Sequence, residues 1–245
     1  MNIAIVGYGK MGQAVERWAI ARGHTVSAII DRKEKKATHA QLSTESLAGS
    51  DVAIDFTAPS TAVDNIRIYG ANKINAVIGT TGWYEHLPEV ESIVRASDIG
   101  LLYAGNFSIG VNLFYAIVAA ASQKISAAGG FDVGINEIHH TGKHDAPSGT
   151  AREISQAVLT HFPSKKRVLL DNAEQPVPAD ALQVTSQRIG STIGVHTVTF
   201  DGVSDTLTLT HTGKNRDGYA SGAVIGAEWL ADKKGLFTAK EWLEL

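Results

Sequence analysis

In the first hundred residues, short apolar runs alternate with segments in which apolar residues recur at helical spacing. Residues 3–6 are apolar and β-branched, and the glycines of "GYGKMG" separate them from a helical pattern that ends at Gly23. Such runs predict strands, and the spacing predicts amphipathic helices. Further strands are predicted over 25–30, 51–56, 76–78 and 100–104, with helices over 61–69 and 87–96. This alternation predicts a parallel, doubly wound sheet.

The second half of the chain has a different pattern. After a helical stretch over 110–125, the sequence predicts a strand over 131–138, a helix over 148–161, and strands over 183–189, 195–201 and 206–212. The separators "GSTIG" and "DGVSD" predict turns between antiparallel strands. In "TLTLTHTG" two leucines and His211 alternate with threonines, so one face of this strand is expected to meet solvent or a partner subunit. A last helix over 221–231 is predicted to end the regular structure.

These elements predict an α/β fold in two domains. The first is a Rossmann-type doubly wound sheet over residues 1–110, and the second is a smaller α+β domain over 111–216 with a mixed or antiparallel sheet. The chain has 245 residues, of which 44% are hydrophobic, enough for one large core or two small ones.

Composition excludes several classes of function. A net charge of -3 gives no basic field for nucleic acid, and the lack of cysteine excludes disulfides and thiolate zinc sites. The start "MNIAIVGYGK" lacks a signal-peptide pattern, and the longest apolar region, 109–121, is shorter than the roughly 20 residues that span a bilayer. We therefore expect a cytoplasmic protein without nucleic-acid or membrane partners.

The glycine loop after the first strand is a candidate dinucleotide site. In the pattern GxGxxG, Gly7 permits a tight turn, Gly9 lets the backbone approach a pyrophosphate, and Gly12 lets the helix pack on the strand. The same glycines could simply serve a strand-to-helix turn. Asp31 lies 19 residues beyond Gly12, at the spacing of an acid that binds a ribose hydroxyl, which favours the dinucleotide interpretation.

The residues around Asp31 bear on the choice between NADH and NADPH. Its carboxylate would accept hydrogen bonds from a free 2′-hydroxyl and repel a 2′-phosphate. The cations that follow, Arg32 and Lys33 among them, could hold that phosphate, so we expect tolerance of both cofactors. For Lys35 and Lys36 an ordinary solvated loop is the simpler interpretation.

Three other loops are predicted at the C-terminal ends of the strands: "DFTAPS", "GTTGW" and "AGNFS". Ligands of doubly wound sheets bind at that edge, where small residues would admit a flat ring. Thr80, Thr81 and Asn106 could bond a nicotinamide carboxamide, although routine turn chemistry explains any one loop equally well.

The segment "EIHHTGKHDAPSGTA", residues 137–151, concentrates ionisable groups. Ser148 is a predicted helix N-cap, and Gly149 and Thr150 would offer N–H groups to a carboxylate-sized anion. Lys143 adds positive charge, and His139 and His140 can exchange protons near neutral pH. The segment therefore predicts an anionic substrate and a proton transfer. His24, His39, His86, His144 and His161 are interpreted as structural residues.

Other chemistries fit this segment less well. His139 and His140 would point to opposite faces of a strand, and no Glu/His set at helical spacing completes a metal site, so none is predicted. A serine hydrolase is disfavoured because no GxSxG motif surrounds Ser148. A cofactor module beside a proton-donating anion site favours a reductase.

The segment over 137–151 and several other motifs of the chain resemble those of a known family. "EIHHTGKHDAPSGTA" closely resembles the signature of the dihydrodipicolinate reductase family, also called 4-hydroxy-tetrahydrodipicolinate reductases, of the diaminopimelate route to lysine. The resemblance extends along the chain through "GYGKMG", "GTTG", "GNFSIGVN", "SQRIG", "GVHTVTF" and "NRDGYASGAV". The family's glycine loop often has one more residue and an arginine before its methionine, where this chain has Lys10, and Gly105 stands where alanine is common.

The resemblance implies roles for individual residues. His139 is expected to be the proton donor and acceptor, and Lys143 a second donor that also attracts a substrate carboxylate. The expected substrate-binding residues are His140, Lys143, Ser148, Gly149 and Thr150. The expected cofactor-binding residues are Gly7, Tyr8, Gly9, Lys10, Met11, Gly12, Asp31, Arg32, Gly79, Thr80, Thr81, Ala104, Gly105, Asn106 and Phe107.

The resemblance also bears on the domains, the assembly and the reaction. Residues 217–245 are expected to complete the cofactor domain, and the substrate-domain sheets to pair into a homotetramer. The implied reaction is NADH- or NADPH-dependent reduction of a cyclic imine, a small dicarboxylate. Arg188, His196 and Arg216 could touch substrate or brace an interface, and they stay outside the predicted site.

Two other functions stay open. One is a different nicotinamide dehydrogenase on the same plan, such as an amino-acid dehydrogenase. The other is a nucleotide-sensing protein without chemistry, which the intact segment over 137–151 disfavours.

Overall fold

The computed structural model describes residues 1–171, 173–215 and 217–245, and its contacts divide the chain into two compact units. Unit 1 comprises Met1–Ile109 and Asp217–Leu245, and unit 2 comprises Gly110–Arg216. The domain limit predicted at Arg216 lies outside the described residues.

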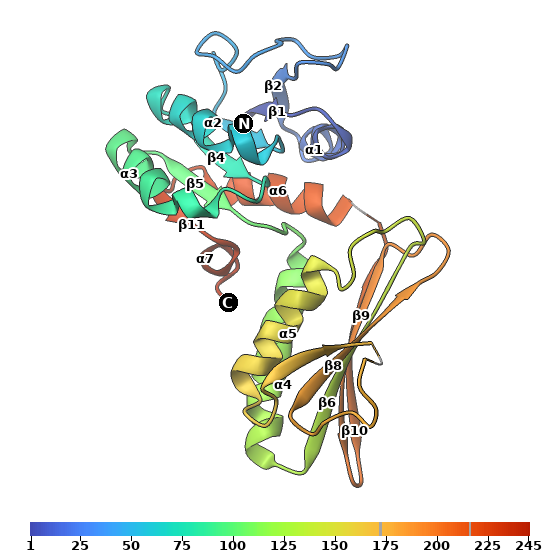
Figure 1. The fold of residues 1–245 in the computed structure, drawn as a ribbon. Helices are drawn as coiled ribbons and strands as arrows, with labels where there is room; N and C mark the ends of the chain where they lie inside the picture. The colour runs from blue at the N-terminus through green and yellow to red at the C-terminus, as the bar shows by residue number, and fades with distance from the viewer. Residues whose placement is uncertain (172, 216) are drawn as a thin grey trace. The chain divides into compact units, whose positions relative to one another are not determined.

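Unit 1 is built on a parallel sheet of strand order β11-β5-β4-β3-β1-β2 (Figure 1). Its strands are β1 (Asn2–Val6), β2 (Thr25–Ile30), β3 (Val52–Asp55), β4 (Asn75–Ile78), β5 (Gly100–Tyr103) and β11 (Gly235–Phe237). Strands β2 and β3 lie on either side of β1, so the strand order reverses there. Doubly wound sheets bind ligands beside such a reversal, at the C-terminal ends of the strands.

Helices cover both faces of this sheet (Figure 1). They are α1 (Lys10–Ala21), α2 (Pro59–Ala71), the 3₁₀ helix η1 (Tyr84–His86), α3 (Leu87–Ser97), α6 (Asp217–Leu230) and α7 (Ala239–Leu243). Because side chains alternate along a strand, Ile3 and Ile5 pack with α1 and α6, whereas Ala4 and Val6 pack with α2 and α3. Both faces are buried, which explains why the strands are almost wholly apolar and confirms the predicted Rossmann-type fold.

Small residues bring α6 close to the sheet. A Cβ on Gly222 would lie 1.8 Å from the carbonyl oxygen of Phe107, and a Cβ on Gly226 would lie 2.7 Å from the Leu102 side chain. Helix α6 is thereby packed against β5 and the loop that follows β5.

Unit 2 combines a mixed sheet with two helices on one of its faces (Figure 1). The strands are β6 (Phe131–His139), β7 (Arg167–Leu170), β8 (Ala181–Arg188), β9 (Gly194–Gly202) and β10 (Thr206–Gly213), in the order β10-β9-β6-β8-β7. Strand β8 is parallel to β6 and β7, and β9 is antiparallel to β6 and β10. The helices are α4 (Ile109–Ala128) and α5 (Gly149–His161). This confirms the predicted α+β class with a mixed sheet.

The structure corrects several predicted elements. Strand β7 was not predicted, and the regular structure continues past residue 231 into β11 and α7. Thr238 and Glu241 form a capping box that starts α7. The "GSTIG" segment does not close a hairpin, because β6 lies between β8 and β9. Among the described residues, no helix is both long and apolar enough to span a membrane.

Candidate functional site

The loop between β1 and α1 needs two of its three motif glycines for steric reasons. Gly7 has φ +86°, a left-handed conformation that favours glycine, and a Cβ there would lie 2.4 Å from the carbonyl oxygen of Phe56. A Cβ on Gly12 would lie 2.2 Å from the carbonyl oxygen of Gly7. A side chain at position 7 would push the loop away from Phe56, and one at position 12 would push α1 away from the loop.

Gly9 differs because the fold itself does not require a glycine there. Its φ of -68° suits any residue, and a Cβ would meet no atom within 4 Å. Gly9 is the N-cap of α1 and offers no capping side chain to the N–H groups of the first turn. An open backbone at a helix N-terminus fits the pyrophosphate of a dinucleotide.

Asp31 joins the glycine loop to the loop after β2. Its carboxylate accepts hydrogen bonds from the N–H groups of Tyr8 (2.8 Å), Lys33 (2.8 Å) and Glu34 (3.2 Å). These bonds, with Lys33 the largest contributor, hold the pKa of Asp31 below its ordinary value. An ionised carboxylate therefore lies beside the loop, as binding to a ribose hydroxyl requires.

The basic residues after Asp31 differ in their surroundings. Arg32 and Lys35 are exposed. Lys36 is exposed too, but its Nζ lies 2.6 and 2.7 Å from the two carboxylate oxygens of Glu16. The ammonium also lies 5.7 Å from the centre of the Tyr8 ring. Lys36 is thus paired within the chain and is more than a solvated loop residue.

A buried carboxylate organises the loop after β3. Asp55 is wholly buried and accepts hydrogen bonds from the Thr57 N–H (3.0 Å), the Thr57 hydroxyl (2.7 Å), Asn65 (2.9 Å) and Tyr69 (2.7 Å). Burial raises the pKa of Asp55, and the hydrogen bonds oppose that rise. The network ties the start of the "DFTAPS" loop to α2.

The loops after β4 and β5 lie next to each other because these strands are parallel neighbours. A Cβ on Gly79 would lie 2.0 Å from the Phe56 ring. Thr80 is buried, and its Oγ1 makes no hydrogen bond with any residue that the structure describes. Asn106 Oδ1 accepts a hydrogen bond from the Ser108 N–H at 2.8 Å. The orphaned Thr80 hydroxyl fits a polar ligand group, as a carboxamide would supply.

In unit 2, the buried face of the sheet changes from apolar to polar toward one end. Apolar residues of β6, β8 and β9 form the core under α4 and α5. Beyond them on the same face lie Glu137 and His139 on β6, Ser186 and Arg188 on β8, and His196 on β9. The strand register places Glu137 between His196 and Ser186, and His139 beside Arg188.

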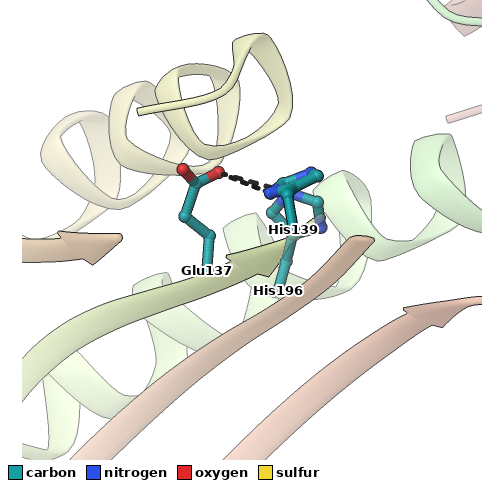
Figure 2. Close-up of side chains that lie close together, drawn as sticks. All are labelled: Glu137, His139 and His196. Carbon is teal, nitrogen blue, oxygen red and sulfur yellow. Dashed lines mark ion pairs between the residues drawn. The ribbon is translucent and has the colours of Figure 1, made fainter. Parts of the chain in front are cut away.

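Glu137 is the residue that the other members of this cluster contact, and Figure 2 shows its carboxylate facing the imidazoles of His139 and His196. It is wholly buried, and one carboxylate oxygen, Oε1, accepts from Arg188 (3.0 Å) and the Ser186 hydroxyl (2.9 Å). The Ser148 N–H lies 3.2 and 3.1 Å from its two oxygens. Burial opposes ionisation, but the hydrogen bonds from Ser148, Arg188 and Ser186 outweigh it and hold the pKa of Glu137 below its ordinary value. The carboxylate is therefore a buried negative charge.

Two imidazoles face the other oxygen of Glu137. The Nδ1 of His139 lies 3.4 Å from Oε2, and the Nε2 of His196 lies 3.8 Å from it. Both rings are buried, and burial is the main cause that lowers the pKa of each, in His196 to about 4. Glu137 opposes the shift of His139, whereas Lys143 and Arg188 add to it. His139 is thus a buried imidazole among opposing charges, which suits proton exchange.

The predicted anion-binding groups lie at the end of β6 and the start of α5. Ser148 is the N-cap of α5, as predicted, and its Oγ accepts from the Ala151 N–H at 3.1 Å. Gly149 is exposed and Thr150 partly so, and both belong to the first turn of α5. The Nζ of Lys143 lies 2.7 Å from Oδ1 of Asp145. Lys143 is therefore already paired with the carboxylate of Asp145.

Glu137, His139 and His196 are also residue types that bind metals, and their polar atoms lie within 4.8 Å of one another. This set was not predicted from the sequence, because strand register brings the three residues together and helical spacing does not reveal them. Arg188, the Ser186 hydroxyl and the Ser148 N–H already bind the carboxylate, and Arg188 neutralises its charge. These contacts favour a role in holding the imidazoles over one in binding a cation.

Comparison with known families decides the assignment. Residues 1–107 match the family model "Dihydrodipicolinate reductase, N-terminus", and residues 110–243 match "Dihydrodipicolinate reductase, C-terminus". The chain belongs to the dihydrodipicolinate reductase family. The resemblance inferred from the sequence motifs is thereby confirmed, and the chain is an oxidoreductase.

Dihydrodipicolinate reductases resemble the chain over its whole length. A 4-hydroxy-tetrahydrodipicolinate reductase of Christiangramia forsetii is 37% identical over 99% of this chain and 98% of its own. A dipicolinate-bound dihydrodipicolinate reductase from Paenisporosarcina sp. TG-14 superposes with a TM-score of 0.82 at 27% identity, covering 98% of each chain. An amine dehydrogenase of Mycobacterium smegmatis, at 13% identity and a TM-score of 0.64 over 96% of this chain and 94% of its own, shares the fold alone.

Part of this arrangement was predicted from the sequence. His139 was singled out, and the structure adds Glu137, Arg188 and His196 around it. Glu137 stood in the quoted segment without a role, and its position two residues before His139 on a strand was the available signal. Arg188 and His196 could be placed only through the register of three strands. Arg216 lies outside the described residues.

Proposed function

We propose that the protein reduces the cyclic imine 4-hydroxy-tetrahydrodipicolinate to tetrahydrodipicolinate with NADH or NADPH, in the diaminopimelate route to lysine, and that the 4-hydroxyl leaves as water before the hydride adds. The observation that carries this proposal is the family match over both units. The buried His139 is chemically consistent with it, because its neighbours Glu137 and His196 both contact Ser148 at the start of α5.

In this proposal unit 1 holds the cofactor. The glycine loop would bind the pyrophosphate, Asp31 the ribose, and Thr80 with the loop 104–107 the nicotinamide end. A reduced nicotinamide, when bound, supplies a hydride to an electron-poor carbon of the ring. We propose that both cofactors serve, because the ionised Asp31 favours a free 2′-hydroxyl while the exposed Arg32 can meet a 2′-phosphate.

Unit 2 would hold the substrate and deliver the proton. The N–H groups of Gly149 and Thr150, the Lys143 ammonium and His140 would bind the two carboxylates. Lys143 would exchange its partner Asp145 for the substrate. His139 would protonate the enamine carbon that hydride addition leaves, and Lys143 is a second donor.

The resemblance also supports a proposed homotetramer built through unit 2. The outer part of β10 and the turn before it leave Leu207 and Val203 exposed, as a subunit contact would require. Light scattering on the purified protein tests this assembly by giving its mass directly.

A coupled assay tests the proposed reaction. A synthase forms the imine from pyruvate and aspartate semialdehyde, and the absorbance of NADH or NADPH is followed. Wild-type protein should oxidise either cofactor, whereas His139→Gln and Lys143→Ala should lose most activity yet still bind cofactor. Oxidation with simple amino or keto acids, and none with the imine, would instead favour another dehydrogenase.

A further inference from the structure

The strand register fixes one nitrogen of His139 toward a carboxylate. Glu137 and His139 are two residues apart on β6 and share its buried face, so both side chains rise on the same side of the sheet (Figure 2). The Nδ1 of His139 lies 3.4 Å from Oε2 of Glu137 and makes no hydrogen bond with any described residue. The nearest charge available to Nδ1 is therefore Glu137.

Glu137 is held on several sides at once. Arg188 and Ser186 bind Oε1, and the Ser148 N–H binds from the start of α5. The side chain has no exposed surface. Such a carboxylate cannot turn away from His139 without breaking contacts to β8 and α5. Its Oε2 is left facing the two imidazoles.

The other edge of the His139 ring has a different neighbour. A Cβ on Gly194 would lie 3.0 Å from Nε2 of His139, so any other residue there would press on the ring. The His196 ring packs edge-on at 5.1 Å between ring centres and limits rotation on that side. The ring is thus confined with Nδ1 toward Glu137.

His196 has a partner of its own at Ser148. Its Nε2 lies 3.1 Å from the Ser148 Oγ and 3.8 Å from Oε2 of Glu137. The Ser148 Oγ also accepts from the Ala151 N–H at 3.1 Å. Of the two imidazoles, His139 has the nitrogen that lies nearer to Oε2, at 3.4 Å.

We propose that Glu137 is a positioning residue that keeps the proton of neutral His139 on Nδ1, so that Nε2 is the nitrogen that exchanges a proton with substrate. This inference rests on the proposed function, because it assigns the proton transfer to His139. In the forward step the N–H bond at Nε2 breaks. The enamine carbon uses the electron pair of its C=C bond to form the new C–H bond, and the imidazolium becomes neutral with Nδ1–H toward Glu137.

The charges around His139 determine how its titration should respond. Burial is the largest influence and lowers the pKa of His139; Glu137 and Asp145 raise it, and Lys143 and Arg188 lower it. His196 contacts it from β9. Glu137→Gln removes the largest raising contribution and leaves the lowering ones, so the pKa of His139 falls further. Activity that needs protonated His139 will then decline at a lower pH than in the wild type.

The test begins with the wild type and does not depend on turnover. Two-bond ¹H–¹⁵N spectra of the imidazoles, with His139 assigned through His139→Gln, report which nitrogen is protonated. We expect Nδ1–H in neutral His139. A neutral ring protonated at Nε2 would overturn the proposal even if the variants described next failed to fold.

Kinetics of Glu137→Gln, Glu137→Asp and the matched exposed variant Glu153→Gln complete the experiment. We expect Glu137→Gln to lose about ten- to hundredfold in kcat with little change in KM, and an acid-shifted pH profile. Glu137→Asp should recover part of the loss, and Glu153→Gln should equal the wild type. A Glu137→Gln enzyme with unchanged kcat and pH profile would refute the positioning role. Absence of wild-type turnover would instead refute the proposed function.

Discussion

The buried His196 should make unit 2 sensitive to mild acid. Its pKa is about 4, lowered first by burial and then by His139, against an ordinary value near 6.5 in the unfolded chain. Glu137 opposes this shift, whereas His211 and Lys143 add to it. Between pH 6.5 and 4 the unfolded chain binds the additional proton, so stability is lost as pH falls through that window.

The expected loss of stability follows from the pH range over which the unfolded chain binds a proton that the folded chain does not. One proton difference changes the free energy of unfolding by about 1.4 kcal/mol per pH unit, which gives about 2 kcal/mol between pH 6.5 and 5. His196→Gln should remove this contribution and flatten the pH dependence by that amount. His161→Gln, on the last turn of α5, is the matched control and should keep the wild-type pH dependence.

Urea unfolding at pH 7 and pH 5 measures the effect, and the chain provides an internal reference. All four tryptophans lie in unit 1, so tryptophan fluorescence follows that unit while far-UV circular dichroism also follows unit 2. The pH-dependent difference between wild type and His196→Gln should appear in the circular dichroism transition. Equal losses from pH 7 to 5 in both proteins would refute the low pKa of His196.

Three further predictions follow from the glycines and from Asp55. Gly9→Ala should lower the unfolding midpoint only slightly, through the poorer N-cap, but weaken NADH binding at least tenfold by fluorescence titration. Gly12→Ala should destabilise the fold much more, and equal behaviour would contradict the distinct roles assigned to the two glycines. Gly194→Ala should displace the imidazole of His139 and lower kcat more than tenfold with a native circular dichroism spectrum; full activity would show that the ring tolerates the methyl group. Asp55→Ala removes the acceptor of four donor groups, on Thr57, Asn65 and Tyr69, and should cost about 3 to 6 kcal/mol by tryptophan-monitored urea unfolding. A loss below about 1 kcal/mol would contradict the network.

Local patterns predicted most of the fold, and the missed elements lack such patterns. The apolar strands and helices of unit 1 follow from periodicity because each is buried on a defined face. Strand β7 is a short edge strand with one buried residue, and β11 has none, so neither has a clear burial pattern. The "GSTIG" turn misled because local turn chemistry does not report that β6 enters between β8 and β9.

The candidate site was predictable only where its residues are close in sequence. The Ser148 N-cap and the buried His139 came from one fifteen-residue segment. Arg188 bonds Glu137 across 51 positions, and His196 reaches Ser148 across 48, through strand order that no local signal carries. The role of Glu137 was missed for the same reason, since its charge is balanced by partners on other strands.

The division of unit 1 into two stretches of sequence has a consequence for biosynthesis. Residues 1–109 leave the ribosome first, yet α6 covers part of β3, β4 and β5, and β11 pairs with the edge of β5. Until residues 217–245 emerge, that apolar face and edge have no partner from their own chain. Unit 2 is one continuous stretch and has all its strands available earlier. We therefore expect unit 2 to complete its fold before unit 1, with the N-terminal sheet exposed to chaperones during the interval.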